Sequence, residues 1–256
     1  MQSLKDTWTM TKRSFQHIIR SIDTIITVVL MPIGMMLLFV YVFGGAFGPH
    51  NGTKYVDFIT PGIIVMTVAS GIAYAAVRLS MDMQSGIINR FRTMPVAPSS
   101  ILGGQAMSST LSNLFSCLLV LGVAFLAGFR SSAGLGAWLA FTGLLVLLTL
   151  ALTWMALFFG LLAKTMEGAG AFSYVLLLLI FISPTFVPTS SMTQALRSFA
   201  ENQPMTPIVE TLRSLLATGT AGSKAWVAVA WIMGILVTMY VASLSMYKRK
   251  TIVSAA

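Results

Sequence analysis

Six long apolar runs constrain this chain more than any other feature of its sequence. They cover residues 25–43, 58–77, 101–129, 135–163, 169–187 and 226–247. A bilayer core about 30 Å thick is crossed by about 20 apolar residues in a helix, and only 9% of the chain is charged. Backbone polar groups find no water partners in lipid, so each run is predicted to be a helix. The chain is therefore predicted to be an all-α integral membrane protein with six spans, forming one domain over residues 1–256.

Three segments outside the spans have an amphipathic pattern. Residues 1–23 combine one apolar face with a basic face, which predicts an interfacial helix on the membrane surface. Residues 86–95 carry an apolar stripe that is preceded by glycine and ended by proline, which predicts a short helix between spans two and three. Residues 188–224 contain two short apolar faces, which predict two short helices between spans five and six, either external or re-entrant.

The basic residues predict how the protein is oriented. The chain has 16 lysines and arginines against 7 acidic residues, for a net charge of +9. If both termini are cytoplasmic, 11 of these cations lie on the cytoplasmic side and 5 lie outside, among them Arg213, as the positive-inside rule requires. The expected location is the bacterial cytoplasmic membrane. A nucleic-acid partner is not expected, because no basic stripe with interleaved aromatic residues is present.

Several kinds of chemistry are not encoded in the sequence. All 7 acidic residues lie outside the apolar runs or at their ends, whereas proton-driven carriers place an ionisable group at membrane depth. No G-x-x-x-x-G-K-[ST] loop is present to bind ATP, and no His, Cys and acid cluster has metal-ligand spacing. The chain is therefore predicted not to be an enzyme, and to move its cargo with energy supplied by another polypeptide. A sodium-coupled carrier that uses backbone carbonyls of a broken helix stays a minor alternative.

Small polar residues in two spans allow two interpretations. Ser112 and Ser116 lie on one stripe of the third span with Asn113 beside them, and Thr153 lies in the fourth span. Such residues usually serve close helix packing. The alternative is that they line a transport path.

Four stretches resemble one known family. They are LLFVYVFGGAF (37–47), DFITPGIIV (57–65), GIINRFRTMPV (86–96) and NQPMTPIVETLRSLL (202–216). In this order they resemble the membrane subunits of type-2 ATP-binding-cassette (ABC) exporters, particularly the daunorubicin-resistance-type drug permeases. The resemblance implies a permease that pairs with a second permease copy, as a homodimer, and docks two copies of a separate ATPase. ATP and Mg would bind to that ATPase, and no cofactor is expected in this chain.

The resemblance also implies which residues contact the ATPase. The segment matching 86–95 would be the coupling helix, the turn after the fourth span would add a smaller contact, and the interfacial helix would also touch the ATPase. The residues concerned are Gly86, Ile87, Ile88, Arg90, Phe91, Arg92, Met94 and Pro95; Lys164 and Glu167; and Lys12, Arg13 and Phe15. The sequence departs from the family pattern at Pro98, where a basic residue is expected, and at Thr193, where proline is common.

The predicted function is therefore that of a membrane subunit of an ATP-driven exporter. It would move an amphipathic drug-like or lipid-like substrate outward by alternating access. A permease for lipid-linked polysaccharide or glycolipid is the alternative within the family, and a standalone secondary carrier is the alternative of a different class. A neighbouring reading frame would discriminate between them, because an ATPase gene favours the exporter and a glycosyltransferase cluster favours the polymer permease.

Overall fold

The computed structural model describes residues 26–44, 54–84, 98–187 and 191–253. Within these ranges the regular secondary structure is helical throughout. A first apolar segment consists of a π-helical turn η1 (Ile26–Leu30), α3 (Met31–Leu38) and a second π-helical turn η2 (Phe39–Phe43). The helices that follow are α5 (Tyr55–Gln84), α7 (Pro98–Leu126), α8 (Leu135–Leu162), α9 (Met166–Ile182), α10 (Gln194–Asn202), α11 (Met205–Thr218) and α12 (Ala225–Val253).

Four helices in the described part of the chain are long and apolar enough to cross a membrane. They are α5, α7, α8 and α12, and they coincide with the second, third, fourth and sixth predicted spans. The first and fifth predicted spans coincide with shorter apolar helices, Met31–Val42 and Met166–Ile182. Over these residues the structure is therefore all-helical and consistent with an integral membrane protein, and six crossings stay a prediction.

The helix boundaries differ from the predicted ones for local reasons. The third predicted span reached residue 129, but α7 ends at Leu126. Gly128 has a φ of 99° and the Phe129 N–H donates to the Ala124 oxygen at 2.9 Å, which is a glycine-based helix cap. The fifth predicted span reached residue 187, but α9 ends at Ile182 because Ser183 precedes a proline and is extended, with a ψ of 164°.

Two helices extend beyond their apolar runs into polar sequence, so hydropathy alone places their C-terminal ends too early. The second predicted span was 58–77, whereas α5 runs on to Gln84. The sixth predicted span was 226–247, whereas α12 runs on to Val253 through a basic stretch. Lysine and arginine are good helix formers, so a helix can leave the lipid without a break.

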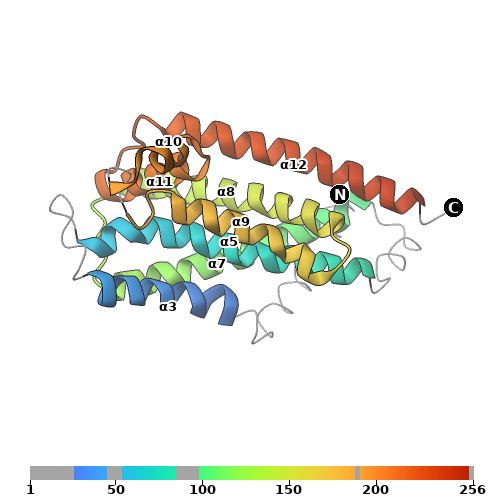
Figure 1. Ribbon diagram of the computed structural model, residues 1–256, viewed down its shortest axis with the longest axis horizontal. Helices are drawn as coiled ribbons and strands as arrows, with labels where there is room; N and C mark the ends of the chain where they lie inside the picture. Colours follow the sequence, from blue (N-terminus) through green and yellow to red (C-terminus); the bar gives the residue numbers. More distant parts are fainter. Residues whose placement is uncertain (1–25, 45–53, 85–97, 188–190, 254–256) are drawn as a thin grey trace.

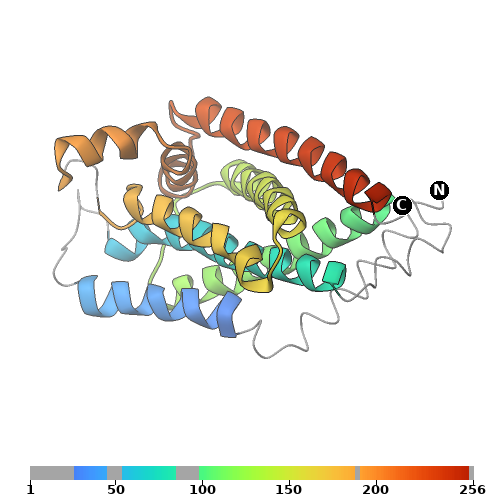
Figure 2. The same cartoon turned by 45° about the vertical axis from the view of Figure 1, so that its right-hand side comes forward.

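The helices form a bundle with α5 at its centre (Figure 1). Helix α5 packs against α7, α8 and α9, while α12 packs mainly against α8. Both views show α12 along one edge of the bundle and α3 along the opposite edge (Figure 2). Helices α10 and α11 lie together at the end where α5 begins, which we call the α11 end. We call the opposite end, where α5 finishes, the Gln84 end.

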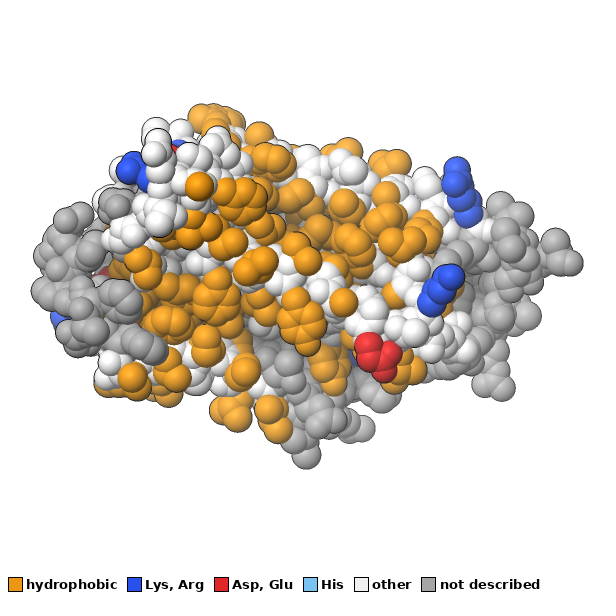
Figure 3. Space-filling model, viewed as in Figure 1, with side chains coloured by type: hydrophobic (Ala, Val, Ile, Leu, Met, Phe, Trp, Pro, Cys, Tyr) orange, Lys and Arg blue, Asp and Glu red, His pale blue; other side chains and the backbone are white. Residues whose placement is uncertain are grey.

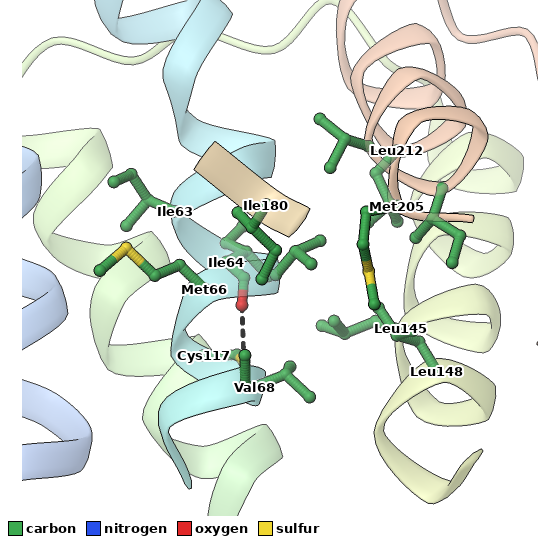
Figure 4. Close-up of a cluster of buried hydrophobic side chains, with 14 of the residues drawn as sticks. Ile63, Ile64, Met66, Val68, Cys117, Leu145, Leu148, Ile180, Met205 and Leu212 are labelled. Carbon is green, nitrogen blue, oxygen red and sulfur yellow. Dashed lines mark hydrogen bonds between the residues drawn. The ribbon is translucent and has the colours of Figure 1, made fainter. Parts of the chain in front are cut away.

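The core contains side chains from five helices (Figure 4). Ile63 and Ile64 of α5 are fully buried, and Leu148 of α8 and Ile180 of α9 pack in the same cluster as Leu212 of α11. The free thiol of the buried Cys117 points at the Ile64 backbone oxygen, at 3.8 Å. Helix α11 is thus packed into the bundle and is not a separate surface element.

The side-chain distribution agrees with a membrane environment. Hydrophobic side chains cover the middle of the face seen in Figure 3, and the charged side chains lie toward its two ends. Large apolar side chains stay exposed on α7, α9 and α12, for example Leu118, Tyr174 and Trp226. An exposed apolar surface of this extent requires lipid or another protein to cover it.

Two predicted segments lie outside the described residues, namely the interfacial helix 1–23 and the coupling helix 86–95. Between the fifth and sixth predicted spans, the described residues contain two short helices, α10 and α11. Their number agrees with the two apolar faces in that segment.

Candidate functional site

The turn between α8 and α9 lies at the Gln84 end and carries two of the predicted ATPase-contact residues. Lys164 and Glu167 are both exposed. Thr165 caps α9 by accepting a hydrogen bond from the Gly168 N–H at 3.1 Å, and Glu167 lies in the first turn of α9, where the helix dipole favours a carboxylate. The turn is therefore a compact structure that presents one cation and one anion.

The end of α5 contacts this turn. The Gln84 side chain donates through Nε2 to the Lys164 backbone oxygen at 3.4 Å and to the Ser80 hydroxyl oxygen at 3.2 Å. The chain after Gln84 leads directly to the predicted coupling segment. The other predicted ATPase-contact residues lie outside the described residues; they are Gly86, Ile87, Ile88, Arg90, Phe91, Arg92, Met94 and Pro95, and Lys12, Arg13 and Phe15.

Helices α5 and α8 are in direct backbone contact behind the turn. A Cβ atom placed on Gly160 would lie 2.7 Å from the Ala76 backbone oxygen, and one on Gly170 would lie 3.3 Å from a Val77 methyl group. Small residues let membrane helices approach this closely. These contacts join α5, α8 and α9 into one closely packed unit behind the turn.

Three of the four residues suggested to line a path bond to their own helices. The Ser112 hydroxyl donates to the Ser108 oxygen at 3.0 Å, Ser116 donates to the Ser112 oxygen at 3.1 Å and Thr153 donates to the Thr149 oxygen at 2.7 Å. Such back-bonding satisfies a hydroxyl within the helix that carries it. These contacts agree equally with packing and with path-lining.

Asn113 is different from the other three. Its side chain is 2% exposed, and its Oδ1 has no hydrogen-bond partner, as is also the case for Ser108 Oγ and Thr110 Oγ1 on the same helix. A buried acceptor without a partner is costly and calls for an explanation. This part of α7 therefore holds unsatisfied polar groups inside the bundle.

Arg213 organises the α11 end. Its Nε donates to the Phe58 oxygen at 3.0 Å, and its Nη2 donates to the Pro184 oxygen at 2.7 Å and to the Thr185 oxygen at 3.4 Å. The guanidinium carbon also lies 3.9 Å from the centroid of the Phe58 ring. One side chain of α11 thus holds the first turn of α5 and the segment that follows α9.

Burial lowers the pKa of the Arg213 guanidinium to about 10, while the nearby Glu210 carboxylate acts in the opposite direction. Arginine remains charged at neutral pH even with this shift. The sequence-based prediction missed this role and counted Arg213 only as an outside charge. A sequence signal for burial was present, because Arg213 lies between Leu212 and Leu216 of the apolar face of α11. Its carbonyl partners, however, cannot be read from a sequence.

Further contacts close the α11 end. The Tyr55 hydroxyl donates to the Phe186 oxygen at 3.3 Å, and the Arg130 N–H donates to Asp57 Oδ1 at 2.9 Å. The Ser131 hydroxyl donates to the Leu216 oxygen at 2.7 Å. The first bond ties α5 to the segment after α9, and the other two tie α5 and α11 to the α7–α8 loop. Within the described ranges, no group of His, Cys, Asp and Glu side chains could hold a metal ion.

Comparison with known proteins identifies similar sequences. The profile of the ABC-2 type transporter family matches residues 5–217. The chain is 29% identical to the daunorubicin resistance ABC transporter permease protein DrrB1 of Streptomyces coeruleorubidus, over 77% of this chain and 70% of that protein. It is 24% identical to the probable doxorubicin resistance ABC transporter permease protein DrrC of Mycobacterium tuberculosis, over 93% and 87%. It is 26% identical to the putative transport permease ycf38 of Porphyra purpurea, over 80% and 71%.

Proposed function

The chain belongs to the ABC-2 type transporter family, and on this premise we propose that it exports an amphipathic drug-like or lipid-like substrate by alternating access. It is the membrane subunit of an ABC transporter, and such a subunit works with an ATPase. The observation that carries the proposal is the family match over residues 5–217. In the proposed arrangement two copies of the chain form a homodimer, two ATPase copies bind ATP and Mg, and both termini face the cytoplasm.

The proposed substrate class has two supports. Relatives of this chain are named for resistance to daunorubicin and doxorubicin. The buried polar side chains described in α7 and α8 are uncharged serine, threonine and asparagine residues. An uncharged interior suits cargo with apolar surface and a few hydrogen-bonding groups better than cargo with several charges.

The proposed coupling runs through the Gln84 end. The bond from Gln84 to the Lys164 oxygen supports a shared contact in which the segment 86–95 and the α8–α9 turn meet the ATPase side by side. We assign Arg90, Phe91 and Arg92 the main contact. Exposed charges such as Lys164 and Glu167 steer docking and add little affinity individually.

The test reconstitutes the chain with its ATPase in lipid nanodiscs. Replacing Arg90, Phe91 and Arg92 together with alanine is expected to abolish the stimulation of ATP hydrolysis by the permease. The matched control replaces Arg197 with alanine, because Arg197 is an exposed arginine in α10 that pairs with Glu201 at 2.8 Å, away from the Gln84 end. Stimulation that survives the triple substitution would overturn the assigned coupling role.

A second measurement tests the direction of transport. Inside-out membrane vesicles that contain the permease and the ATPase are expected to accumulate a fluorescent anthracycline only when ATP is present. Accumulation by vesicles that contain the permease without any ATPase would instead favour the secondary carrier.

A further inference from the structure

The contacts of Arg213 connect three parts of the chain that are distant in sequence. The donor lies on α11, one acceptor is Phe58 in the first turn of α5, and the other acceptors are Pro184 and Thr185 just after α9. Arginine suits this task because its planar guanidinium donates in several fixed directions at once, whereas lysine is a point charge on a flexible stem. The side chain is therefore a three-way connection that lysine cannot reproduce.

The charge of Arg213 is stabilised without an ion pair. Glu210 pairs with Lys224, and its carboxylate favours the charged form of Arg213 without forming an ion pair with it. Arg213 is stabilised by carbonyl dipoles and by the face of the Phe58 ring. Carbonyls and a guanidinium are both well hydrated when they separate into water. Water can replace each of these hydrogen bonds when the groups separate, so a connection of this kind can open and reform.

Near Arg213, the backbone of α5 at Gly62 packs directly against the Thr185 side chain of the segment after α9. A Cβ atom placed on Gly62 would lie 2.9 Å from Thr185 Cβ and 2.1 Å from its methyl carbon. The Tyr55 hydroxyl reaches the Phe186 oxygen across the same line of contact. We call this contact between residues 55–62 and 183–187 the seam. Both parts of the seam accept hydrogen bonds from Arg213.

Helix α11 has anchors that do not involve Arg213. The Ser131 hydroxyl donates to the Leu216 oxygen at 2.7 Å, the Ser132 hydroxyl donates to the Ala217 oxygen, and Lys224 pairs with Glu210 at 2.8 Å. These contacts attach α11 to the α7–α8 loop and to the start of α12. If the Arg213 bonds break, α11 is still held in place, and the Tyr55 bond and the packing of Gly62 against Thr185 are the remaining contacts described across the seam.

We propose that Arg213 is the positioning residue of a gate at the α11 end, and that its bonds to Phe58, Pro184 and Thr185 hold the seam shut in the resting transporter. This inference rests on the proposed function. ATP-driven movement of α5 and α9 breaks these bonds, the seam parts, and cargo leaves at the α11 end. The carbonyls and the guanidinium are hydrated while the gate is open, and they pair again when it closes.

The test measures whether the seam is closed. The chain is reconstituted with its ATPase in sealed vesicles, with Cys117→Ser to remove the natural thiol and Ile63→Cys to introduce one next to the seam. Ile63 is 0% exposed, and a membrane-impermeant maleimide is added only on the side of the α11 end, so that labelling reports opening from that end. The variant is Arg213→Lys. The matched control is Arg130→Lys, because Arg130 also donates to two carbonyl oxygens, at 3.2 and 2.9 Å, but these belong to Phe125 at the end of α7 and to the adjacent Phe129, so neither bond joins distant parts of the chain.

Without nucleotide, the labelling rate is expected to rise by about tenfold or more in Arg213→Lys, since lost charge-assisted hydrogen bonds shift a closed–open equilibrium on this scale. Arg130→Lys is expected to label like the parent. The ATPase should still be stimulated, because the Gln84 end is unchanged, while the cargo moved per ATP hydrolysed falls. Unchanged labelling in Arg213→Lys would overturn the gate.

A second variant opens the seam with Arg213 in place. Gly62→Ala adds a methyl group against Thr185 and is expected to raise labelling, and adding Thr185→Gly is expected to restore protection. If Gly62→Ala leaves labelling unchanged, the seam is not the barrier and the gate is overturned.

If the parent complex moves no cargo with ATP, the proposed function fails, while the labelling comparison still decides whether Arg213 closes the α11 end.

Discussion

Gly160 of α8 and Ala76 of α5 approach so closely that a Cβ atom on Gly160 would lie 2.7 Å from the Ala76 backbone oxygen. The obstacle is backbone in the middle of a long helix, so it cannot turn aside as the end of a side chain can. This contact joins α5, the central helix, to α8, against which α12 packs. It also provides a test of the close packing in the bundle.

We predict that Gly160→Ala destabilises the protein by about 1–3 kcal/mol, the usual cost of overpacking a well-filled interior. Gly143→Ala on the same helix is the matched control. Gly143 has open space around its Cβ position, so this change is expected to be neutral or stabilising by a few tenths of a kcal/mol to about 1 kcal/mol. Thermal unfolding of both variants in the same detergent measures the difference. Equal melting temperatures would contradict the close contact.

Gln84 gives a prediction about coupling. Gln84→Ala removes the bond to the Lys164 oxygen, while Lys164→Ala leaves this backbone acceptor in place. An exposed neutral hydrogen bond contributes about 0.5–1.5 kcal/mol, so Gln84→Ala is expected to weaken ATPase docking by about 2–10-fold. Binding of the purified ATPase to permease nanodiscs checks this result. Docking weakened by Lys164→Ala alone would assign the effect to its charge and not to the bond.

Substitution of Asn113 distinguishes a role of this residue in helix packing from a role in lining the transport path. Its Oδ1 is buried without a partner, so Asn113→Leu, which removes the unsatisfied group, is expected to leave stability unchanged or raise it by about 1–3 kcal/mol. If cargo uses this group during transport, the same variant loses affinity for cargo while ATP hydrolysis continues. Ser112→Ala is the control, because Ser112 already bonds within α7. A variant with normal transport would remove Asn113 from the path.

The charge of Arg213 predicts a flat response to pH. Burial lowers the pKa of this group from its ordinary value to about 10. A group with a lowered pKa in the folded state loses its contribution to stability as the pH falls from its ordinary pKa to about 10, and this contribution changes no further at lower pH. The difference in melting temperature between the parent and Arg213→Met should therefore be constant from pH 6 to 9, a range chosen to lie below this pKa. A difference that varies across this range would mean that another titrating group controls the α11 end.

The fold was largely predictable because hydropathy reports burial in lipid directly. The runs that became α5, α7, α8 and α12 were all identified from apolar length. The errors lie at helix ends, where local geometry outweighs hydropathy. Pro184 ends α9 before its apolar run is over. The positive φ of Gly128 likewise ends α7 before the end of its apolar run.

The candidate site was predicted less completely, because its contacts use backbone atoms. Lys164 and Glu167 were identified from the family resemblance, and the structure locates them beside the end of α5. Arg213 was classified as an outside charge because its partners are the carbonyls of Phe58, Pro184 and Thr185, and every residue has a carbonyl. The contact of Gly62 with Thr185 is hidden for a similar reason, since glycine is common in membrane helices wherever they pack.

The position of α12 has a consequence for how the protein is made. Helix α12 packs mainly on α8 and secondarily on α11, while α5 is already enclosed by α7, α8 and α9. The contacts among these four helices therefore need no residue after Ile182. During synthesis they can all form before the insertion machinery receives α12. Helix α12 then packs onto helices that have already assembled. A chain that ends before Ala225 is therefore expected to keep the contacts among α5, α7, α8 and α9, with one face of α8 exposed to lipid.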